Sequence, residues 1–199
     1  MTLAERLRGA LEEGHRRRPL LLPGDSLEWE EPGEDIMPAA VLVAVVERPS
    51  PTVILTLRPE TMRKHPGQIS FPGGRIDPED AGPVAAALRE AQEEIGLPPA
   101  AVQIIGLADR YRTVTGFEVT PVVGVVPPDL PVTPQPGEVA AVFEAPLAYL
   151  LDPDNHRICE IEWLGRMRSY YEIQWRDRRI WGATAAMIVN LSRRLELPS

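Results

Sequence analysis

Residues 89–97 read Arg-Glu-Ala-Gln-Glu-Glu-Ile-Gly-Leu, and this stretch constrains the interpretation of the whole chain. Its glutamates, Glu90, Glu93 and Glu94, are spaced i, i+3 and i+4, so an α-helix puts all three on one face. Neighbouring carboxylates repel one another, and near the C-terminal end of a helix the macrodipole adds to that cost. A row of glutamates is usually a solvated helix face. Here, however, the clustered charge also predicts a compensating cation.

The stretch lies in a predicted helix that runs from about Pro83 to Ile95. Gly96 and Pro98 end this helix, because glycine is favoured just past a helix and proline cannot continue one. Its apolar residues, which we expect on a side away from the carboxylates, are Val84, Leu88, Ala91 and Ile95. The glutamates are thus expected on an exposed face.

Two features favour a metal site over a solvated face. Clustered carboxylate oxygens are the protein ligands that Mg²⁺ prefers, while phosphate oxygens and water complete its octahedron. Upstream, Phe71-Pro72-Gly73-Gly74 can bring bare backbone close to the acidic face, since glycine allows approaches that a side chain would block. An ordinary turn is the other interpretation of this segment.

Together these residues resemble the Nudix box of the Nudix hydrolases, in which a glycine precedes a glutamate and then Arg-Glu-apolar-x-Glu-Glu-x-Gly-apolar. Gly74 starts the box, and residues 89–97 end it. The interval from the glycine to the arginine is one residue longer than in the general pattern, and the middle acid is Asp80 or Glu79. In the family this acid braces the arginine, Arg89 in this chain.

The resemblance implies an α+β fold, a Nudix-type α/β/α sandwich with a mixed β-sheet and a catalytic loop-helix-loop. It implies that Glu90, Glu93 and Glu94 bind Mg²⁺ or Mn²⁺, joined by the Gly73 carbonyl, and that the attacking water is thereby activated. Arg89 would hold the glutamates in place, although spacing alone equally allows a surface pair with Glu93.

A further carboxylate outside the box often assists catalysis in this family. Glu138, expected at the start of an apolar strand after a Pro/Gly loop, is preferred here over Glu118 and Glu144.

The residues before the box resemble the coenzyme A pyrophosphatase subgroup, which also has the longer interval. They are Leu55-Thr56-Leu57-Arg58, Arg63, Gly67 and the segment 71–74, with Pro59 where the subgroup has a small residue. This resemblance implies cleavage of coenzyme A or its derivatives to 4′-phosphopantetheine and adenosine 3′,5′-bisphosphate.

Substrate binding is expected from the basic loop and the glycines. Arg58 and Arg63 suit the pyrophosphate or the ribose 3′-phosphate through the planar arginine fork, with a solvated loop as the alternative. His65 is a further candidate, and Gly73 and Gly74 bring main chain to the substrate. Two other functions stay open: hydrolysis of ADP-ribose, NADH or a dinucleoside polyphosphate, and a non-catalytic Nudix-fold nucleotide-binding module. A module of that kind is expected to lose a box glutamate.

The remaining sequence predicts one domain, 1–199, with an N-terminal helix and acidic connection over 1–37 and a core over 38–199. Strands are expected at 39–47, 52–58, 69–71, 102–108, 118–126, 138–143, 157–163 and 170–175. The first two are expected to pair antiparallel. A helical turn or two over 146–151 and a helix over 182–195 complete the expectation.

Composition limits the class of protein. The chain has 21 Lys+Arg against 29 Asp+Glu, a formal net charge of −8, which argues against a nucleic-acid partner. The single cysteine, Cys159, fits a reducing compartment. The longest apolar run, 38–46, is about half the roughly 20 residues that a membrane span needs. We therefore expect a cytoplasmic protein that binds no membrane. The resemblance implies a coenzyme A-like small molecule as its partner, and a homodimer stays open.

Overall fold

The structure is a computed structural model that describes residues 1–22, 24, 36–61, 66–163 and 165–196. Most of the acidic connection and the loop with Arg63 and His65 lie outside the described residues. The elements in chain order are α1 (Leu3–Arg17), β1 (Met37–Val46), β2 (Thr52–Leu57), β3 (Ile69–Ser70), β4 (Gly73–Arg75), α2 (Pro83–Ile95), η1 (Pro99–Ala101), β5 (Gln103–Leu107), β6 (Tyr111–Arg112), β7 (Phe117–Val126), β8 (Ala141–Pro146), α3 (Leu147–Leu151), η2 (Pro153–Asn155), β9 (Arg157–Trp163), β10 (Arg166–Trp175), β11 (Arg178–Trp181) and α4 (Ala183–Leu195).

The larger sheet is mixed and has β1 at its centre. β1 pairs with β7 in parallel along its whole length. On its other side it pairs antiparallel with β4 near its start and with β2 near its end. β3 and β8 both pair with β2, and β5 and β6 both pair with β7. Because β1 changes partner along its length, the sheet opens between β4 and β2.

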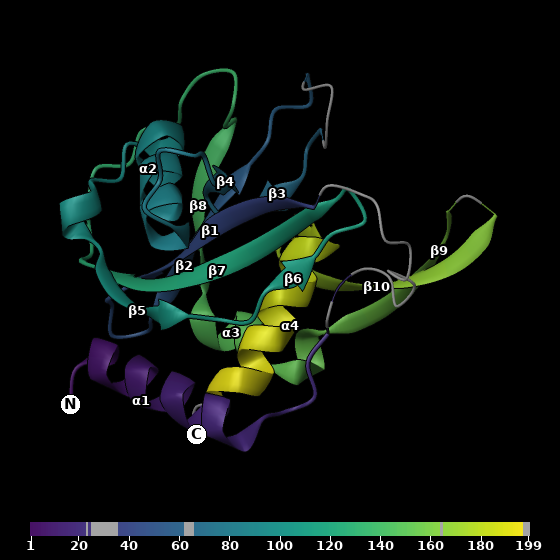
Figure 1. The fold of residues 1–199 in the computed structure, drawn as a ribbon, viewed down its shortest axis with the longest axis horizontal. Coiled ribbons are helices and arrows are strands. Elements are labelled where there is room, and N and C mark those ends of the chain that lie inside the picture. Colours follow the sequence, from purple (N-terminus) through teal and green to yellow (C-terminus); the bar gives the residue numbers. More distant parts are fainter. Residues whose placement is uncertain (23, 25–35, 62–65, 164, 197–199) are drawn as a thin grey trace.

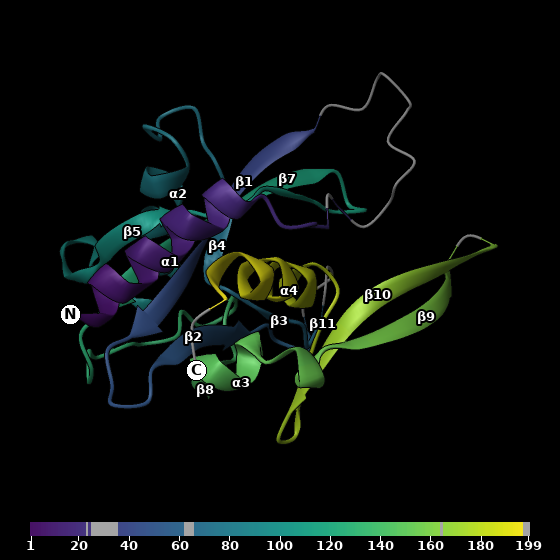
Figure 2. The ribbon, with the colours of Figure 1, turned by 90° about the horizontal axis from the view of Figure 1, so that it is seen from below.

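Helices cover both faces of this sheet (Figure 1). Successive side chains of a strand point to opposite faces, so Leu42 and Ala44 pack in the cluster that contains α2, whereas Val43 and Val45 pack in the cluster that contains α1 and α4. Figure 2 shows α1 and α4 side by side across the face opposite α2. This arrangement confirms the predicted α+β fold with helices on either side of a mixed sheet.

A second sheet of three antiparallel strands, in the order β11-β10-β9, packs against α4. Its β9–β10 hairpin extends away from the rest of the molecule (Figure 2). Ile158, Ile161 and Met167 on this hairpin are 65%, 48% and 64% exposed.

Most of the long elements lie where the sequence predicts them, including α2, and β1 and β2 do pair antiparallel. The expected strand over 138–143 is wrong at its start, because β8 begins at Ala141. Glu138 lies instead in a turn, where its N–H donates to the Gln135 carbonyl at 3.2 Å, next to Gly137 with a φ of +97°. β4, β6 and β11 were not expected. None of the described helices has the length and hydropathy needed to cross a bilayer.

Candidate active site

Glycines set both ends of the helix α2. Gly82 precedes Pro83 with a φ of +126°, and proline is well suited to the first helical turn, where its missing N–H costs nothing. At the other end Gly96 is left-handed, with a φ of +68°, and its N–H donates to the last turn. These ends place the helix with its acidic face beside β4.

The acidic face is only partly exposed, which corrects the expectation of a solvated row. The side chain of Glu93 is 57% exposed, that of Glu90 is 18% exposed, and Glu94 as a residue is only 7% exposed. The cause is that Ala86 and Ala87, both fully buried, extend the packed side of α2 round to the glutamates. Small residues there let the helix lie close to the sheet.

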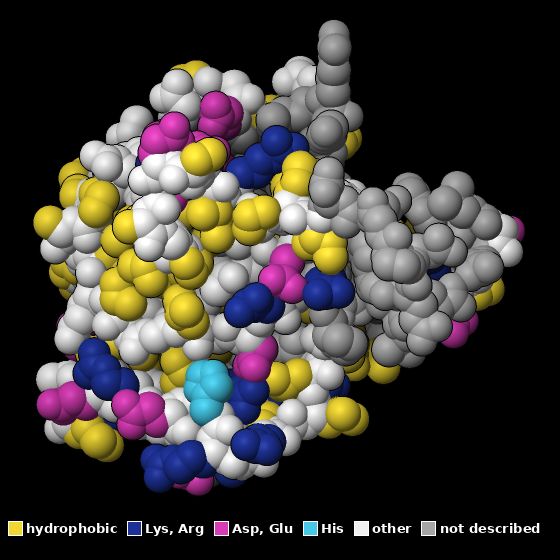
Figure 3. All heavy atoms as spheres, in the orientation of Figure 1, with side chains coloured by type: hydrophobic (Ala, Val, Ile, Leu, Met, Phe, Trp, Pro, Cys, Tyr) yellow, Lys and Arg dark blue, Asp and Glu magenta, His cyan; other side chains and the backbone are white. Residues whose placement is uncertain are grey.

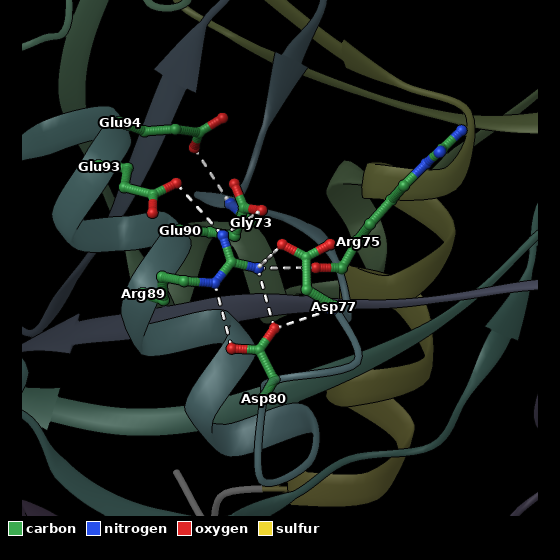
Figure 4. A network of polar contacts seen from close by, with 8 residues as sticks. All are labelled: Gly73, Arg75, Asp77, Asp80, Arg89, Glu90, Glu93 and Glu94. Atoms are coloured by element: carbon green, nitrogen blue, oxygen red, sulfur yellow. Dashed lines mark hydrogen bonds and ion pairs between the residues drawn. The ribbon is translucent and has the colours of Figure 1, made fainter.

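Arg89 is the centre of the polar network in Figure 4. Its Nε and Nη2 donate to the two carboxylate oxygens of Asp80 at 3.1 and 2.9 Å. Its Nη1 donates to Glu90 at 3.0 Å and to Glu93 at 3.2 Å. Hydrogen bonding from Arg89 lowers the pKa of Asp80. Of the two middle acids that the sequence left open, the structure therefore pairs Asp80 with Arg89.

The same arginine also fastens the loop before α2. Its Nη2 donates to the main-chain carbonyl of Arg75 at 3.0 Å and lies 3.4 Å from the Asp77 carboxylate. The side chain of Arg75 points away from the carboxylates (Figure 4). No feature of the residue pattern points to Asp77, which lies in the loop between the two ends of the box.

The glycine pair brings main chain against two of the glutamates. The Gly73 N–H donates to Glu94 Oε2 at 3.1 Å. At Gly74, a Cβ would lie 2.5 Å from the carboxyl carbon of Glu90. Since real Cβ atoms do not come so close, a side chain at this position would displace the carboxylate.

Burial makes the charged forms of these two carboxylates unfavourable, and the neighbouring positive groups do not fully compensate for it. Burial raises the pKa of Glu94 to about 7; the Gly73 N–H and Arg58 oppose the shift, and Glu90 and Glu138 add to it. Burial also raises the pKa of Glu90, against the effect of Arg89. A desolvated anion without a matching cation is costly, so the site favours a bound positive charge. Figure 3 shows the acidic side chains gathered over α2.

The structure brings two more of the predicted residues to this place. Arg58 and Glu138 both act electrostatically on Glu94, and Glu138 is exposed. The Gln135 N–H donates to the main-chain carbonyl of Glu94 at 2.8 Å, which fixes the turn that carries Glu138. The Nε of Arg58 is buried and, within the described part of the chain, has no hydrogen-bond partner. The alternatives to Glu138 are engaged elsewhere: Glu118 with Arg110 and Arg112, and Glu144 with Arg48.

The donor set suits a hard divalent cation, although the carboxylates do not yet converge. Among the residues that the structure describes, no group of three His, Cys, Asp or Glu side chains is already arranged to hold a metal ion. Glu90 and Glu93 accept hydrogen bonds from Arg89, and Glu94 accepts one from the Gly73 N–H. Carboxylate oxygens on two successive turns, together with the under-compensated burial of Glu94, fit Mg²⁺ or Mn²⁺.

Comparisons with known proteins give a family model and several relatives that match this chain. The family model described as NUDIX domain matches residues 37–179. An uncharacterized Nudix hydrolase NudL of Cronobacter sakazakii is 49% identical over 154 residues, which cover 77% of this chain and 80% of the relative. NudL of Escherichia coli K12 is 46% identical with the same coverage. A solved Nudix hydrolase of M. smegmatis, RenU, is 23% identical over 56% of this chain and 71% of that chain, with a TM-score of 0.49.

Proposed function

The chain belongs to the NUDIX domain family and is a Nudix hydrolase acting on a pyrophosphate substrate, and we propose that this substrate is coenzyme A or one of its derivatives. The products would be 4′-phosphopantetheine and adenosine 3′,5′-bisphosphate. Support comes from the stretch 55–74, which resembles the coenzyme A pyrophosphatase subgroup, and above all from one juxtaposition. The Nε of Arg58, buried and without a hydrogen-bond partner among the described residues, belongs to a guanidinium that acts electrostatically on Glu94, so the proposed phosphate-binding group lies near a proposed metal ligand.

Three glutamates and one carbonyl would hold the metal: Glu90, Glu93, Glu94 and the carbonyl of Gly73. When bound, Mg²⁺ or Mn²⁺ supplies charge neutralisation of the diphosphate and acidification of a water. Arg89, held by Asp80, donates to the carboxylates of Glu90 and Glu93 and so limits their rotation, which would keep their oxygens available to the metal. Glu138, which is exposed and acts electrostatically on Glu94, would accept the proton of the attacking water.

Arg58 would bind a phosphate of the substrate, because a guanidinium N–H that is buried and unpaired is costly until an acceptor reaches it. Arg63 and His65 are proposed as further substrate contacts from the subgroup resemblance alone. The metal-directed roles predict that Glu94→Gln lowers kcat by about two orders of magnitude or more.

A substrate panel with product identification tests the proposal. We expect Mg²⁺- or Mn²⁺-dependent cleavage of coenzyme A in preference to ADP-ribose, NADH and diadenosine polyphosphates. Faster cleavage of one of those three would contradict the coenzyme A assignment and leave a pyrophosphatase. No turnover of any compound, with nucleotide still bound, would favour a non-catalytic module; the presence of all three box glutamates speaks against that outcome.

The role of Arg58 is tested with dephospho-coenzyme A. If Arg58 contacts the 3′-phosphate, removal of that phosphate costs a charge-assisted hydrogen bond, about one to two decades in kcat/KM. Arg58→Ala should then remove the preference for coenzyme A. Arg110→Ala is the control, because Arg110 is 69% exposed and pairs with Glu118. An equal loss on both substrates would instead assign Arg58 to the pyrophosphate.

A further inference from the structure

A cleft of about 420 Å³ opens on the α2 face of the sheet, toward the end of β1 that is remote from Gly73 and Gly74. Its size is typical of small-molecule sites. It lies between the ends of β1, β2 and β7, the strand β8 and the segment that follows β7. It is lined from the sheet by Val46, Ile54 and Val126, from the segment after β7 by Asp129 and Leu130, and from β8 by Glu144.

The side of this cleft that faces the sheet is apolar. Val46, Ile54 and Val126, which line it from the sheet, are 2%, 4% and 1% exposed and belong to the core cluster that contains α2. Leu130 and Val132, from the segment after β7, are partly buried against the same cluster. Apolar side chains therefore line one side of the cleft, and an apolar ligand that rests against them would gain free energy mainly by removing its own surface from water.

The polar side chains at its edge already satisfy one another. The Nε and Nη2 of Arg48 donate to the two carboxylate oxygens of Glu144 at 3.0 Å each, and Nη1 donates to Asp129 at 3.2 Å. The Thr52 hydroxyl also donates to Glu144. Hydrogen bonding from Arg48 lowers the pKa of Glu144. Two carboxylates face one guanidinium, so the edge carries a net negative charge and repels an anionic group.

One segment joins the cleft to the glutamates. The N–H groups of Thr133 and Gln135 donate to the carbonyls of Ile95 and Glu94, both at 2.8 Å, directly after Val132 of the cleft wall. The strands β2 and β8 run between the same two places, because Leu57, next to Arg58, pairs with Ala141, whereas Ile54 pairs with Glu144. Three residues of strand span about 10 Å. A chain-like substrate can therefore reach both.

We propose that this cleft binds an uncharged, apolar arm of the diphosphate substrate, a hydrocarbon or acyl chain carried beyond the group that is cleaved. The inference rests on the proposed function, since coenzyme A is the substrate class in which a long flexible arm separates the diphosphate from an acyl group. It also predicts a selectivity. An apolar chain raises the kcat/KM of the substrate, and a carboxylate at the end of that chain cancels this increase.

The experiment compares coenzyme A, hexanoyl-coenzyme A and adipoyl-coenzyme A, the last two differing only in the terminal carboxylate. For the parent protein we expect hexanoyl-coenzyme A to exceed coenzyme A at least tenfold in kcat/KM, mostly through KM, because several methylenes are buried at about a two- to fourfold gain each. Adipoyl-coenzyme A should fall back to the level of coenzyme A or below.

Two variants locate this effect in the cleft. Leu130→Trp fills the cleft, and we expect it to reduce the hexanoyl preference to within about twofold while coenzyme A itself is cleaved normally. Leu107→Trp is the matched control, since Leu107 is 41% exposed on β5 and does not line the cleft. Asp129→Asn removes one charge from an 82% exposed side chain at the edge and should narrow the gap between hexanoyl and adipoyl substrates at least threefold. Asparagine tolerates the φ of +62° at this position.

The outcomes separate the two proposals. Cleavage of coenzyme A without any acyl preference, or the same preference in Leu130→Trp as in Leu107→Trp, overturns the cleft assignment and leaves the proposed function intact. Absence of coenzyme A cleavage in the parent protein overturns both. If Leu130→Trp fails to fold, Asp129→Asn still decides, because an unchanged hexanoyl-to-adipoyl ratio contradicts the position of the arm.

Discussion

At Gly74 a single hydrogen atom decides the position of a proposed metal ligand. A methyl group there would lie 2.5 Å from Glu90 Oε1. We expect Gly74→Ala to push this carboxylate aside and to lower kcat at least tenfold, with little change in the melting temperature, because the carboxylate end is the part that moves. Gly9→Ala is the control: a Cβ at Gly9 meets nothing within 4 Å, so this helix substitution should stabilise slightly and leave kcat unchanged. Normal turnover by Gly74→Ala would separate Glu90 from the reaction.

The raised pKa of Glu94 predicts how the stability of the protein depends on pH. The folded pKa of Glu94 is raised from 4.5 to about 7, so between these values the native state holds a proton that the unfolded chain has lost. The contribution to stability is present below about pH 4.5 and is lost as the pH rises through 7, by up to about 3 kcal/mol. In chelator we expect the melting temperature of the parent to fall from pH 5 to pH 8 more than that of Glu94→Gln. Added Mg²⁺ should restore stability at pH 8. Equal slopes for the two proteins would contradict the burial argument.

The sequence identifies these residues by type but not by environment. The spacing of the three glutamates is visible in residues 89–97, and Arg89 with it. The exposure of each carboxylate depends on Ala86 and Ala87, because their small side chains let α2 lie close to the sheet. The residue pattern alone does not show how far the helix is rotated about its own axis. The exposure of Glu93 and the burial of Glu94 follow from that rotation of the helix.

At the scale of elements, the loop before α2 is tied to the helix through Arg89. Asp80 accepts hydrogen bonds from both Nε and Nη2 of the guanidinium, whereas Glu79, its neighbour, is exposed. We expect Asp80→Asn to lower kcat about tenfold and to destabilise the fold by about 1–3 kcal/mol, because a partly buried charge-assisted pair loses its anion. Glu79→Gln, the same change one residue earlier, should stay within twofold of the parent. Chemical unfolding and steady-state kinetics on the pair decide this, and equal effects would contradict the assignment.

Long periodic elements are predictable, and short ones are not. Strand β1, with ten mostly apolar residues, and the amphipathic helix α2 carry their own signal. The strand β4 consists of Gly73-Gly74-Arg75, which resembles a turn, and it is a strand only because β1 provides the pairing edge. Likewise the apolar pattern predicts a strand from residue 138, but residues 136–138 form a turn, so β8 starts only at Ala141. This displacement moves Glu138 from a strand to an exposed turn beside Glu94.

At the scale of the whole molecule, α1 and α4 cover the sheet face opposite the glutamates, although the NUDIX domain match spans only residues 37–179. Arg194 of α4 pairs with Asp109 and donates to the carbonyl of Gly14 in α1 at 2.5 Å. Asn190 binds the main chain of Leu22 through both its side-chain oxygen and nitrogen. These contacts join the first helix, and the segment that follows it, to the last helix on the same face of the sheet. We therefore propose that residues 1–199 fold as one domain.

This proposal predicts that a destabilising substitution in α1 lowers the stability of the entire protein. Leu7 is fully buried in the cluster that includes β1 and α4, so Leu7→Ala should destabilise the protein by about 2–5 kcal/mol through lost burial and the cavity left behind. Leu20→Ala is the matched control, because Leu20 is 87% exposed. If the chain is one cooperative unit, thermal unfolding of Leu7→Ala stays a single transition at lower temperature, followed identically by far-ultraviolet circular dichroism and tryptophan fluorescence. A separate early transition, with the rest melting at the parent temperature and turnover intact in between, would show instead that α1 is an appendage to an independently folded core.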